Sequence, residues 1–251
     1  MKLVEDLRDI HKNKEIWIVG TGPSLDNFPD DFFCEKKEDG KILEPEKITI
    51  ALNWSILVFP KSTYWHACHP ETVLWMKKNH PEVLKKSFTL LPMVPFRGHF
   101  RKKKLTEEIS LNLLGEHKDD PVYLRWHWIV GNRPRFMELL PGTIKAIIAG
   151  KDCRYIALGT CIHYAIQIAV IIGSKKITLV GCELKADKDR IHARSRGLLE
   201  PYPTYTRKGF NMYVRRFGRL RLGIELLAKS FKPYGIEIQR YYYKSGYEAV
   251  T

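Results

Sequence analysis

Short apolar runs alternate with helical patterns along much of this chain. At residues 15–19 such a run follows a charged segment and ends at a glycine, which predicts a short strand buried on both faces, as in a parallel sheet. Further strands are expected at residues 48–52, 62–68, 88–93, 177–181 and 236–238.

Helical periodicity is sharpest over residues 162–172, where Gly173 is placed to end the helix as a C-cap glycine. The strand expected at residues 177–181 follows closely, and a helix leading directly into a buried strand favours a parallel crossover. Other helices are expected over residues 3–12, 70–78 and 210–231. The sequence therefore predicts an α/β fold: a Rossmann-like, mainly parallel sheet flanked by helices, in a single domain over residues 1–251.

Residues 96–142 do not fit this alternation. They contain a basic run at residues 101–104, three prolines (Pro121, Pro134 and Pro141) and aromatic residues without a clear period. Loops of this length in compact proteins are often functional. We expect this middle third to form an irregular insertion, a lid or a small subdomain.

The charge of the chain is unusual. The formal net charge is +14 at pH 7, and residues 185–221 hold 11 Lys or Arg against three acidic residues. Such a concentration indicates an anionic partner, which includes a nucleotide, a phosphorylated glycan, an acidic membrane surface and a nucleic acid. The alternative is a solvated basic face with no partner.

Other features narrow the class of protein. No apolar run reaches the roughly 18 residues that a membrane span needs, and residues 1–15 mix acidic residues through the segment, unlike a secretion signal. The five cysteines are scattered and odd in number, which favours free thiols in a reducing compartment. We expect a cytoplasmic protein, either free or peripheral to the inner face of the membrane.

The turn after residue 19 carries the first candidate chemistry. Gly20 and Gly22 allow a tight turn that a ligand can approach, and a helix starting at Pro23 and Ser24 would offer free N–H groups to a phosphate. The dinucleotide fingerprint is incomplete because Leu25 stands at the third glycine, and no GK[ST] follows. An ordinary strand-to-helix turn is the alternative.

In open α/β sheets, ligands bind beyond the carboxyl ends of the strands. The residues expected at these ends supply amide, hydroxyl, carboxylate and imidazole groups, which suit a nucleotide: Gly20, Thr21, Gly22, Pro23, Ser24, Asn53, His69, Thr160 and Glu183.

The neighbouring residues in the sequence suggest a different role for each histidine. His66, Cys68 and His69 are too closely spaced for one tetrahedral site and have no matching pair elsewhere, so no metal site is expected. His163 lies near the start of a helix, where packing or capping explains it. His192 follows Glu183 in an irregular basic stretch, where an imidazole could act as a general base; a surface histidine is the alternative.

Three motifs carry a resemblance. They resemble motifs of the bacterial CMP-sialic-acid sialyltransferases. The first is VGTGPSL at residues 19–25, and the second is ALN at residues 51–53. The third begins with Gly159 and Thr160, at the start of a helix, and ends with IIGSKKITLVGCE at residues 171–183. They equally resemble the relatives that share that fold, the motility-accessory-factor flagellin glycosyltransferases and the archaeal 6-hydroxymethylpterin diphosphokinases. The resemblance covers the turn, the second strand and roughly residues 155–240.

The resemblance implies roles for several residues. The turn at residues 20–24 and Asn53 would hold the nucleotide phosphates and sugar, with Thr160 nearby. His69 would match a polar residue before a proline, and His192 would match the general base. Tyr202 or Tyr205 would match tyrosines that assist the departing phosphate, although their order relative to the histidine differs. Two further departures are Thr21 in place of asparagine and Glu183 in place of aspartate.

The expected function is therefore an inverting glycosyltransferase with a nucleotide-sugar co-substrate, favouring a CMP-sugar, and a glycan or other hydroxyl acceptor, with no cofactor. One alternative is a Mg²⁺-dependent diphosphokinase that transfers pyrophosphate from ATP to a pterin-like alcohol. Another is a nucleic-acid-binding or nucleic-acid-modifying protein that uses the basic segment at residues 185–221.

Overall fold

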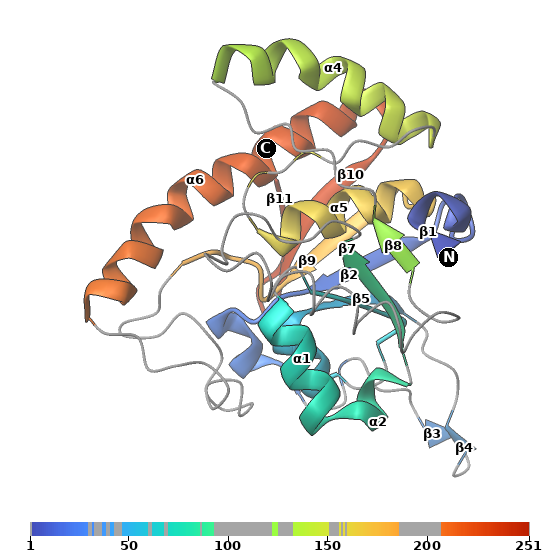
Figure 1. Ribbon diagram of the computed structural model, residues 1–251, viewed down its shortest axis with the longest axis vertical. Helices are drawn as coiled ribbons and strands as arrows, with labels where there is room; N and C mark the ends of the chain where they lie inside the picture. The colour runs from blue at the N-terminus through green and yellow to red at the C-terminus, as the bar shows by residue number, and fades with distance from the viewer. Residues whose placement is uncertain are drawn as a thin grey trace, which may run out of the picture.

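A nine-stranded sheet forms the centre of the protein, and its strands follow the order β1-β8-β7-β6-β5-β2-β9-β10-β11. Neighbouring strands run parallel, except that β11 is antiparallel to β10 (Figure 1). The strands are β1 (Lys2–Leu3), β2 (Glu15–Val19), β5 (Ile48–Leu52), β6 (Tyr64–His66), β7 (Phe88–Pro92), β8 (Val122–Leu124), β9 (Lys176–Val180), β10 (Glu237–Tyr242) and β11 (Gly246–Ala249). A separate hairpin pairs β3 (Lys37–Glu38) with β4 (Lys41–Ile42). The Rossmann-like α/β prediction is confirmed.

This description rests on a computed structural model. It describes residues 2–29, 32, 37–38, 41–42, 47–59, 62–67, 70–85, 87–92, 122–124, 133–150, 156, 158, 160–185 and 207–250.

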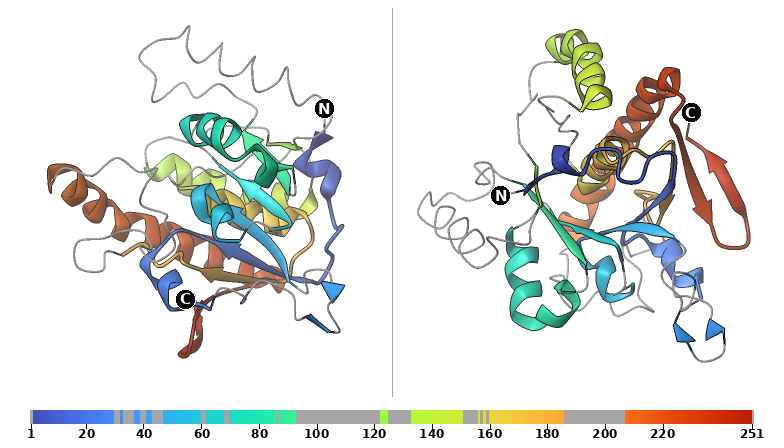
Figure 2. Two further views of the ribbon diagram at one scale, coloured as in Figure 1. Left: turned by 90° about the horizontal axis from the view of Figure 1, so that it is seen from below. Right: turned by 90° about the vertical axis from the view of Figure 1, so that its right-hand side faces the viewer.

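Helices cover both faces of the sheet (Figure 2). One face carries α4 (Arg133–Ala149), α5 (Cys161–Ile171) and α6 (Arg207–Phe231), and the other carries α1 (Pro70–Asn79) and α2 (Pro81–Leu84). Every residue of α5 is buried, because it packs between the sheet and the outer helices. The core is accordingly divided into two apolar clusters, one on each face of the sheet.

The centre of the sheet is β2, which lies between β5 and β9. After β2 the chain enters the short 3₁₀ helix η2 (Pro23–Asn27), whose Leu25 belongs to the cluster on the α1 face. After β9 the chain leads to α6 on the opposite face. The carboxyl ends of β2 and β9 therefore form the topological switch point, where open α/β sheets bind their ligands.

The helix expected over residues 3–12 is a wrong prediction. A 3₁₀ helix, η1 (Val4–Leu7), is followed by turns in which Asp9 and Asn13 adopt positive φ. The backbone N–H groups of Asp9, His11 and Asn13 donate to the carbonyls of Ile171, Ile172 and Gly173. These bonds satisfy carbonyl groups at the end of α5, which a helix over residues 3–12 would leave open.

The middle third contributes to the sheet. Residues 122–124 form β8, and α4 begins at Arg133 and continues through Pro141, an exposed position. This helix was not predicted because prolines usually interrupt helices. Its apolar pattern was nevertheless present, since Leu140, Ile144 and Ile147 are buried at helical spacing. Residues 93–121 and 125–132 lie outside the described residues, so the lid remains a prediction.

The C-terminal strand was expected at residues 236–238 and extends to Tyr242, and β11 pairs with it as a hairpin. The long final helix is confirmed as α6, and its first turns extend away from the sheet (Figure 1). Among the described residues, no helix is long and apolar enough to cross a membrane.

Candidate functional site

The glycine turn after β2 lies directly against the end of β9. The Gly20 N–H donates to the Val180 carbonyl over 2.7 Å, and the Gly22 N–H donates to the Gly181 carbonyl over 2.8 Å. A Cβ atom at Gly20 would lie 2.3 Å from the Gly181 carbonyl oxygen, which only glycine avoids. The glycine turn after β2 and the segment after β9, both predicted from the sequence to carry site residues, therefore meet at the switch point.

Glu183 occupies the turn with its side chain. The Ser24 N–H donates to Oε1 over 2.7 Å, and the Ser24 hydroxyl donates to Oε2 over 3.1 Å. A Cβ atom at Gly22 would lie 2.5 Å from Oε2, so the carboxylate lies against the backbone of Gly22. Glu183 is 5% exposed, and we call this arrangement of Ser24, Gly22 and Glu183 the carboxylate clasp.

The clasp occupies a backbone N–H of the turn that was predicted to be free for a phosphate. The N–H groups of Gly20, Gly22 and Leu25 bond to backbone carbonyls, and that of Ser24 bonds to Glu183. The turn also opens η2, a 3₁₀ helix of five residues rather than an α-helix. Pro23 has no N–H, so a phosphate can bind Ser24 only by displacing the carboxylate.

Asn53 directly follows β5, the strand on the other side of β2 from β9. Its φ of 51° is in the left-handed region, which asparagine adopts more readily than most residues. Its backbone carbonyl accepts from the Trp65 indole N–H over 2.7 Å, and its side-chain Oδ1 lies 3.5 Å from the Cys161 Sγ. Thr160 is the N-cap residue of α5 and precedes Cys161, but its side chain makes no capping bond. Asn53 and the start of α5 therefore meet at the carboxyl end of the sheet, as expected.

Ser55 fixes the end of β5 against β2. Its hydroxyl accepts from the Leu52 N–H over 2.8 Å and donates to the Val19 carbonyl over 2.7 Å. Ser55 is completely buried in η3 (Asn53–Leu57), so these two bonds hold the edge of the site rigidly.

Two histidines at this end of the sheet are completely buried. His66, the last residue of β6, bonds through Nδ1 to the Leu90 carbonyl, and burial lowers its pKa to about 4. His163 in α5 bonds through Nε2 to the Leu220 carbonyl of α6, and burial lowers its pKa to about 4 as well. Because carbonyls accept, each of these ring nitrogens donates, and the lowered pKa values leave both rings neutral near pH 7. Of the two roles expected for His163, packing or capping, its complete burial in α5 agrees with packing.

The described cysteines, Cys161 and Cys182, are free and buried. Burial, and then the charge of Glu183, raise the pKa of the Cys182 thiol above its ordinary value. Cys182 therefore stays protonated and cannot serve as a thiolate nucleophile.

A charged side chain on the neighbouring strand was not among the predicted site residues. Arg240 lies in β10 and pairs with Leu179 in β9. Its Nη1 lies 3.9 Å from Oε1 of Glu248 in β11. The signal was present, because strand alternation from Ile236 and Ile238 places Arg240 on a face that packs against the core.

Other predicted site residues lie outside the described part of the chain: His69, His192, Tyr202 and Tyr205. Their roles rest on the resemblance alone. In the part of the chain that the structure describes, no group of three or more His, Cys, Asp or Glu side chains is placed to hold a metal ion.

Comparisons with known proteins returned nothing: no family model, curated protein or solved structure matches this chain.

Proposed function

We propose that the protein is a glycosyltransferase that binds a nucleotide sugar, favouring a CMP-sugar, at the carboxyl ends of β2, β5 and β9. The observation that carries the proposal is the direct contact between the glycine turn after β2 and the Gly181–Glu183 segment after β9. This contact lies at the topological switch point, where folds of this architecture bind nucleotides. The type of reaction, transfer of a sugar to a hydroxyl group, is inferred from the resemblance to the sialyltransferases.

The chemistry requires a base and a group that accepts the departing phosphate. His192 would accept the proton of the acceptor hydroxyl as it attacks the donor sugar with inversion. Tyr202 or Tyr205 would donate a hydrogen bond to the leaving phosphate, where negative charge develops in the transition state. Asn53 and Thr160 would contact the nucleotide.

The carboxylate clasp gives this proposal a test of its own. A nucleotide phosphate at Ser24 must compete with the Glu183 carboxylate for one N–H and one hydroxyl. Glu183→Gln keeps an acceptor for Ser24 but removes the negative charge, so it should tighten phosphate binding by about tenfold. If Glu183 instead binds the hydroxyl groups of the ligand, the same variant should weaken binding.

The decisive experiment is a thermal-shift screen with CMP, CDP, UDP, GDP, ADP and ATP. A ligand at 100 times its Kd adds about 2.7 kcal/mol of stability. For a protein of this size that shift is roughly 5–10 °C in Tm. A preference for CMP supports the proposal, and no shift with any nucleotide contradicts it.

His192→Ala separates chemistry from binding. We expect turnover to fall by about a hundredfold or more while nucleotide binding stays nearly intact, because a general base acts only on the reacting proton. Equal loss of binding and turnover would identify His192 as a ligand contact or a structural residue.

A second candidate is the Mg²⁺-dependent diphosphokinase. The position of Glu183 beside the turn favours it, because a carboxylate next to phosphates can hold Mg²⁺. Adding EDTA to the turnover assay distinguishes the two enzymes, since only the diphosphokinase loses its activity.

A third candidate uses α6 to bind an anionic macromolecule. Arg216, Arg219, Arg221 and Lys229 are exposed along this helix, and Leu222 is 64% exposed beside them. If a nucleic acid binds here, its affinity should fall steeply with salt as counterions are released. Vesicles of anionic lipid supply the competing arm of the same titration.

A further inference from the structure

Arg240 is a nearly buried cation. It lies two residues after Ile238 in β10, on the face that packs against the apolar cluster under α4, α5 and α6, and its side chain is 13% exposed. Its Nη1 faces Glu248, whose side chain is 58% exposed, over a distance of 3.9 Å. An ion pair of that length to an exposed carboxylate contributes little to stability.

The other edge of the guanidinium makes no hydrogen bond with any described residue. Nε and Nη2 are both covered, and neither makes a hydrogen bond in the part of the chain that the structure describes. These two atoms form one side of the planar group, and their parallel N–H bonds match two oxygens of a phosphate or a carboxylate. Covered N–H groups of a cation are costly when unpaired, which points to a missing acceptor.

The position of this edge agrees with a ligand site. Arg240 pairs with Leu179, one residue before the end of β9, and lies one strand beyond the carboxylate clasp. Burial, and then the charge of Glu248, raise the pKa of the Tyr242 hydroxyl, while Arg240 opposes this change and Glu183 adds to it. Four side chains therefore interact electrostatically near the carboxyl ends of β9 and β10: Glu183, Arg240, Tyr242 and Glu248.

We propose that the Nε–Nη2 edge of Arg240 binds an oxyanion of a small-molecule ligand. Phosphate and carboxylate groups both satisfy this edge, and the site extends the switch-point region by one strand. The proposal does not depend on a nucleotide being the ligand. Both nitrogen atoms are covered in this structure, so the oxyanion reaches them only when a covering group moves.

The direct test observes the Arg240 Nε–H resonance by ¹H–¹⁵N NMR. Inorganic phosphate should shift this resonance, sodium chloride at matched ionic strength should not, and malonate forms a parallel arm that tests the carboxylate source. Arg240→Lys identifies the resonance and keeps the charge, but it loses the paired N–H groups. We expect phosphate to bind this variant about tenfold more weakly or worse.

Arg240→Met gives a second measurement whose sign distinguishes the proposal from a structural role. Without added oxyanion, this variant should raise Tm, because it removes covered N–H groups that have no partner. With phosphate, it should lose the stabilisation that the unmodified chain gains. Glu248→Gln is the matched control, since it leaves the Nε–Nη2 edge intact and should keep the phosphate response.

Two results would overturn the proposal: an Arg240 resonance that ignores both phosphate and malonate, or an Arg240→Met variant with a lower Tm and an unchanged phosphate response. These results are separable from the nucleotide screen. Nucleotide binding that is indifferent to Arg240 leaves the glycosyltransferase proposal standing and rejects this one. Phosphate binding at Arg240 in a protein that binds no nucleotide does the reverse.

Discussion

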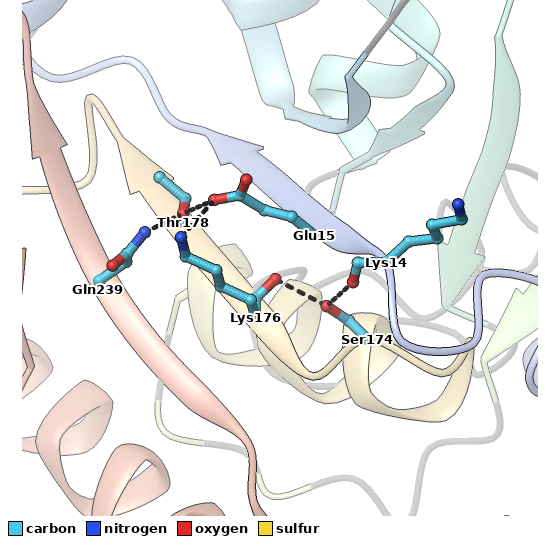
Figure 3. Close-up of polar contacts among 6 residues, drawn as sticks. All are labelled: Lys14, Glu15, Ser174, Lys176, Thr178 and Gln239. Atoms are coloured by element: carbon cyan, nitrogen blue, oxygen red, sulfur yellow. Dashed lines mark hydrogen bonds and ion pairs between the residues drawn. The ribbon is translucent and has the colours of Figure 1, made fainter.

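The two ends of strands β2, β9 and β10 differ in how their polar groups are satisfied. At the amino end Glu15 Oε1 accepts over 2.6 Å from the hydroxyl of Thr178, in the middle of β9, and that hydroxyl accepts from the Gln239 side-chain amide over 2.9 Å (Figure 3). The Ser174 hydroxyl lies 2.9 Å from the Lys14 carbonyl and 2.8 Å from that of Lys176. Each of these buried hydroxyl groups is used within the chain.

At the carboxyl end of the same strands, some polar groups lack a partner or are bonded to a group that a ligand could replace. The carboxylate of Glu183 occupies an amide that a ligand could otherwise bind, and Arg240 keeps two covered N–H groups without a partner among the described residues. Native proteins satisfy almost all buried polar groups, so unsatisfied ones mark strain or an absent partner. The described hydroxyl groups at the amino end are satisfied within the chain, so that end is closed by its own side chains; we propose that a ligand satisfies the unpaired groups at the carboxyl end.

Acid should produce the largest effect, and it acts at the carboxyl end. His66 and His163 have pKa values lowered to about 4, below the 6.5 of the unfolded chain. Above pH 6.5 both are neutral in both states and the full stability is present. Between pH 6.5 and 4 the unfolded chain alone takes up protons, so each histidine costs about 3 kcal/mol across that window.

Urea denaturation at several pH values measures this loss. His163→Gln should reduce the slope of stability against pH by up to about 1.4 kcal/mol per pH unit, the effect of one proton. The same slope in the variant and the parent chain would show that His163 titrates normally, and would remove this contrast between the ends of the sheet.

Gly20→Ala should destabilise the fold by about 3 kcal/mol, because its Cβ would lie 2.3 Å from a backbone oxygen that cannot move alone. Gly218→Ala is the matched control: nothing lies within 4 Å of its Cβ, and it is inside α6, so it should stabilise by about 0.5–1 kcal/mol. Thermal melts compare the two. Similar effects would mean that the glycine turn is not closely packed against β9.

The sequence predicted this contact but not its chemistry. Buried, largely β-branched runs specify β2 and β9 because both faces of a central parallel strand are covered. The helical spacing of apolar residues, followed by Gly173, specifies α5. Edge elements were missed: β11 has mostly exposed side chains, and its pairing depends on a turn with positive φ at Lys244 and Gly246.

The state of the glycine turn could not be predicted for a different reason. Whether an N–H is free depends on a carboxylate 159 residues away in the chain, which no local pattern reports. Arg240 was within reach of the alternation rule, had the final strand been extended beyond residue 238. The roles of residues outside the described ranges, His192 above all, remain predictions from the sequence.

Thr178→Val tests the closed end. It keeps the shape but removes the hydroxyl that accepts from the Gln239 amide and donates to the Glu15 carboxylate, and it should cost about 2 kcal/mol. The double variant Thr178→Val with Gln239→Leu should recover part of this loss, because both partners of one bond are then apolar. A neutral Thr178→Val would show that the amino end is not held by this network, in contrast to the rise in Tm expected for Arg240→Met.

The smallest effect is expected at the surface of the same network. Lys176 lies 3.8 Å from Glu15 Oε1 and 5.0 Å from the centre of the Tyr247 ring, but its side chain is 41% exposed. Water and salt screen such contacts, so Lys176→Met should change the free energy of unfolding by less than about 0.5 kcal/mol. Urea denaturation at low and high salt checks this, and the difference from the parent chain should shrink at high salt. A larger loss of unfolding free energy that does not depend on salt would mean that the Lys176–Glu15 ion pair stabilises the amino end more than the buried Thr178 hydroxyl does.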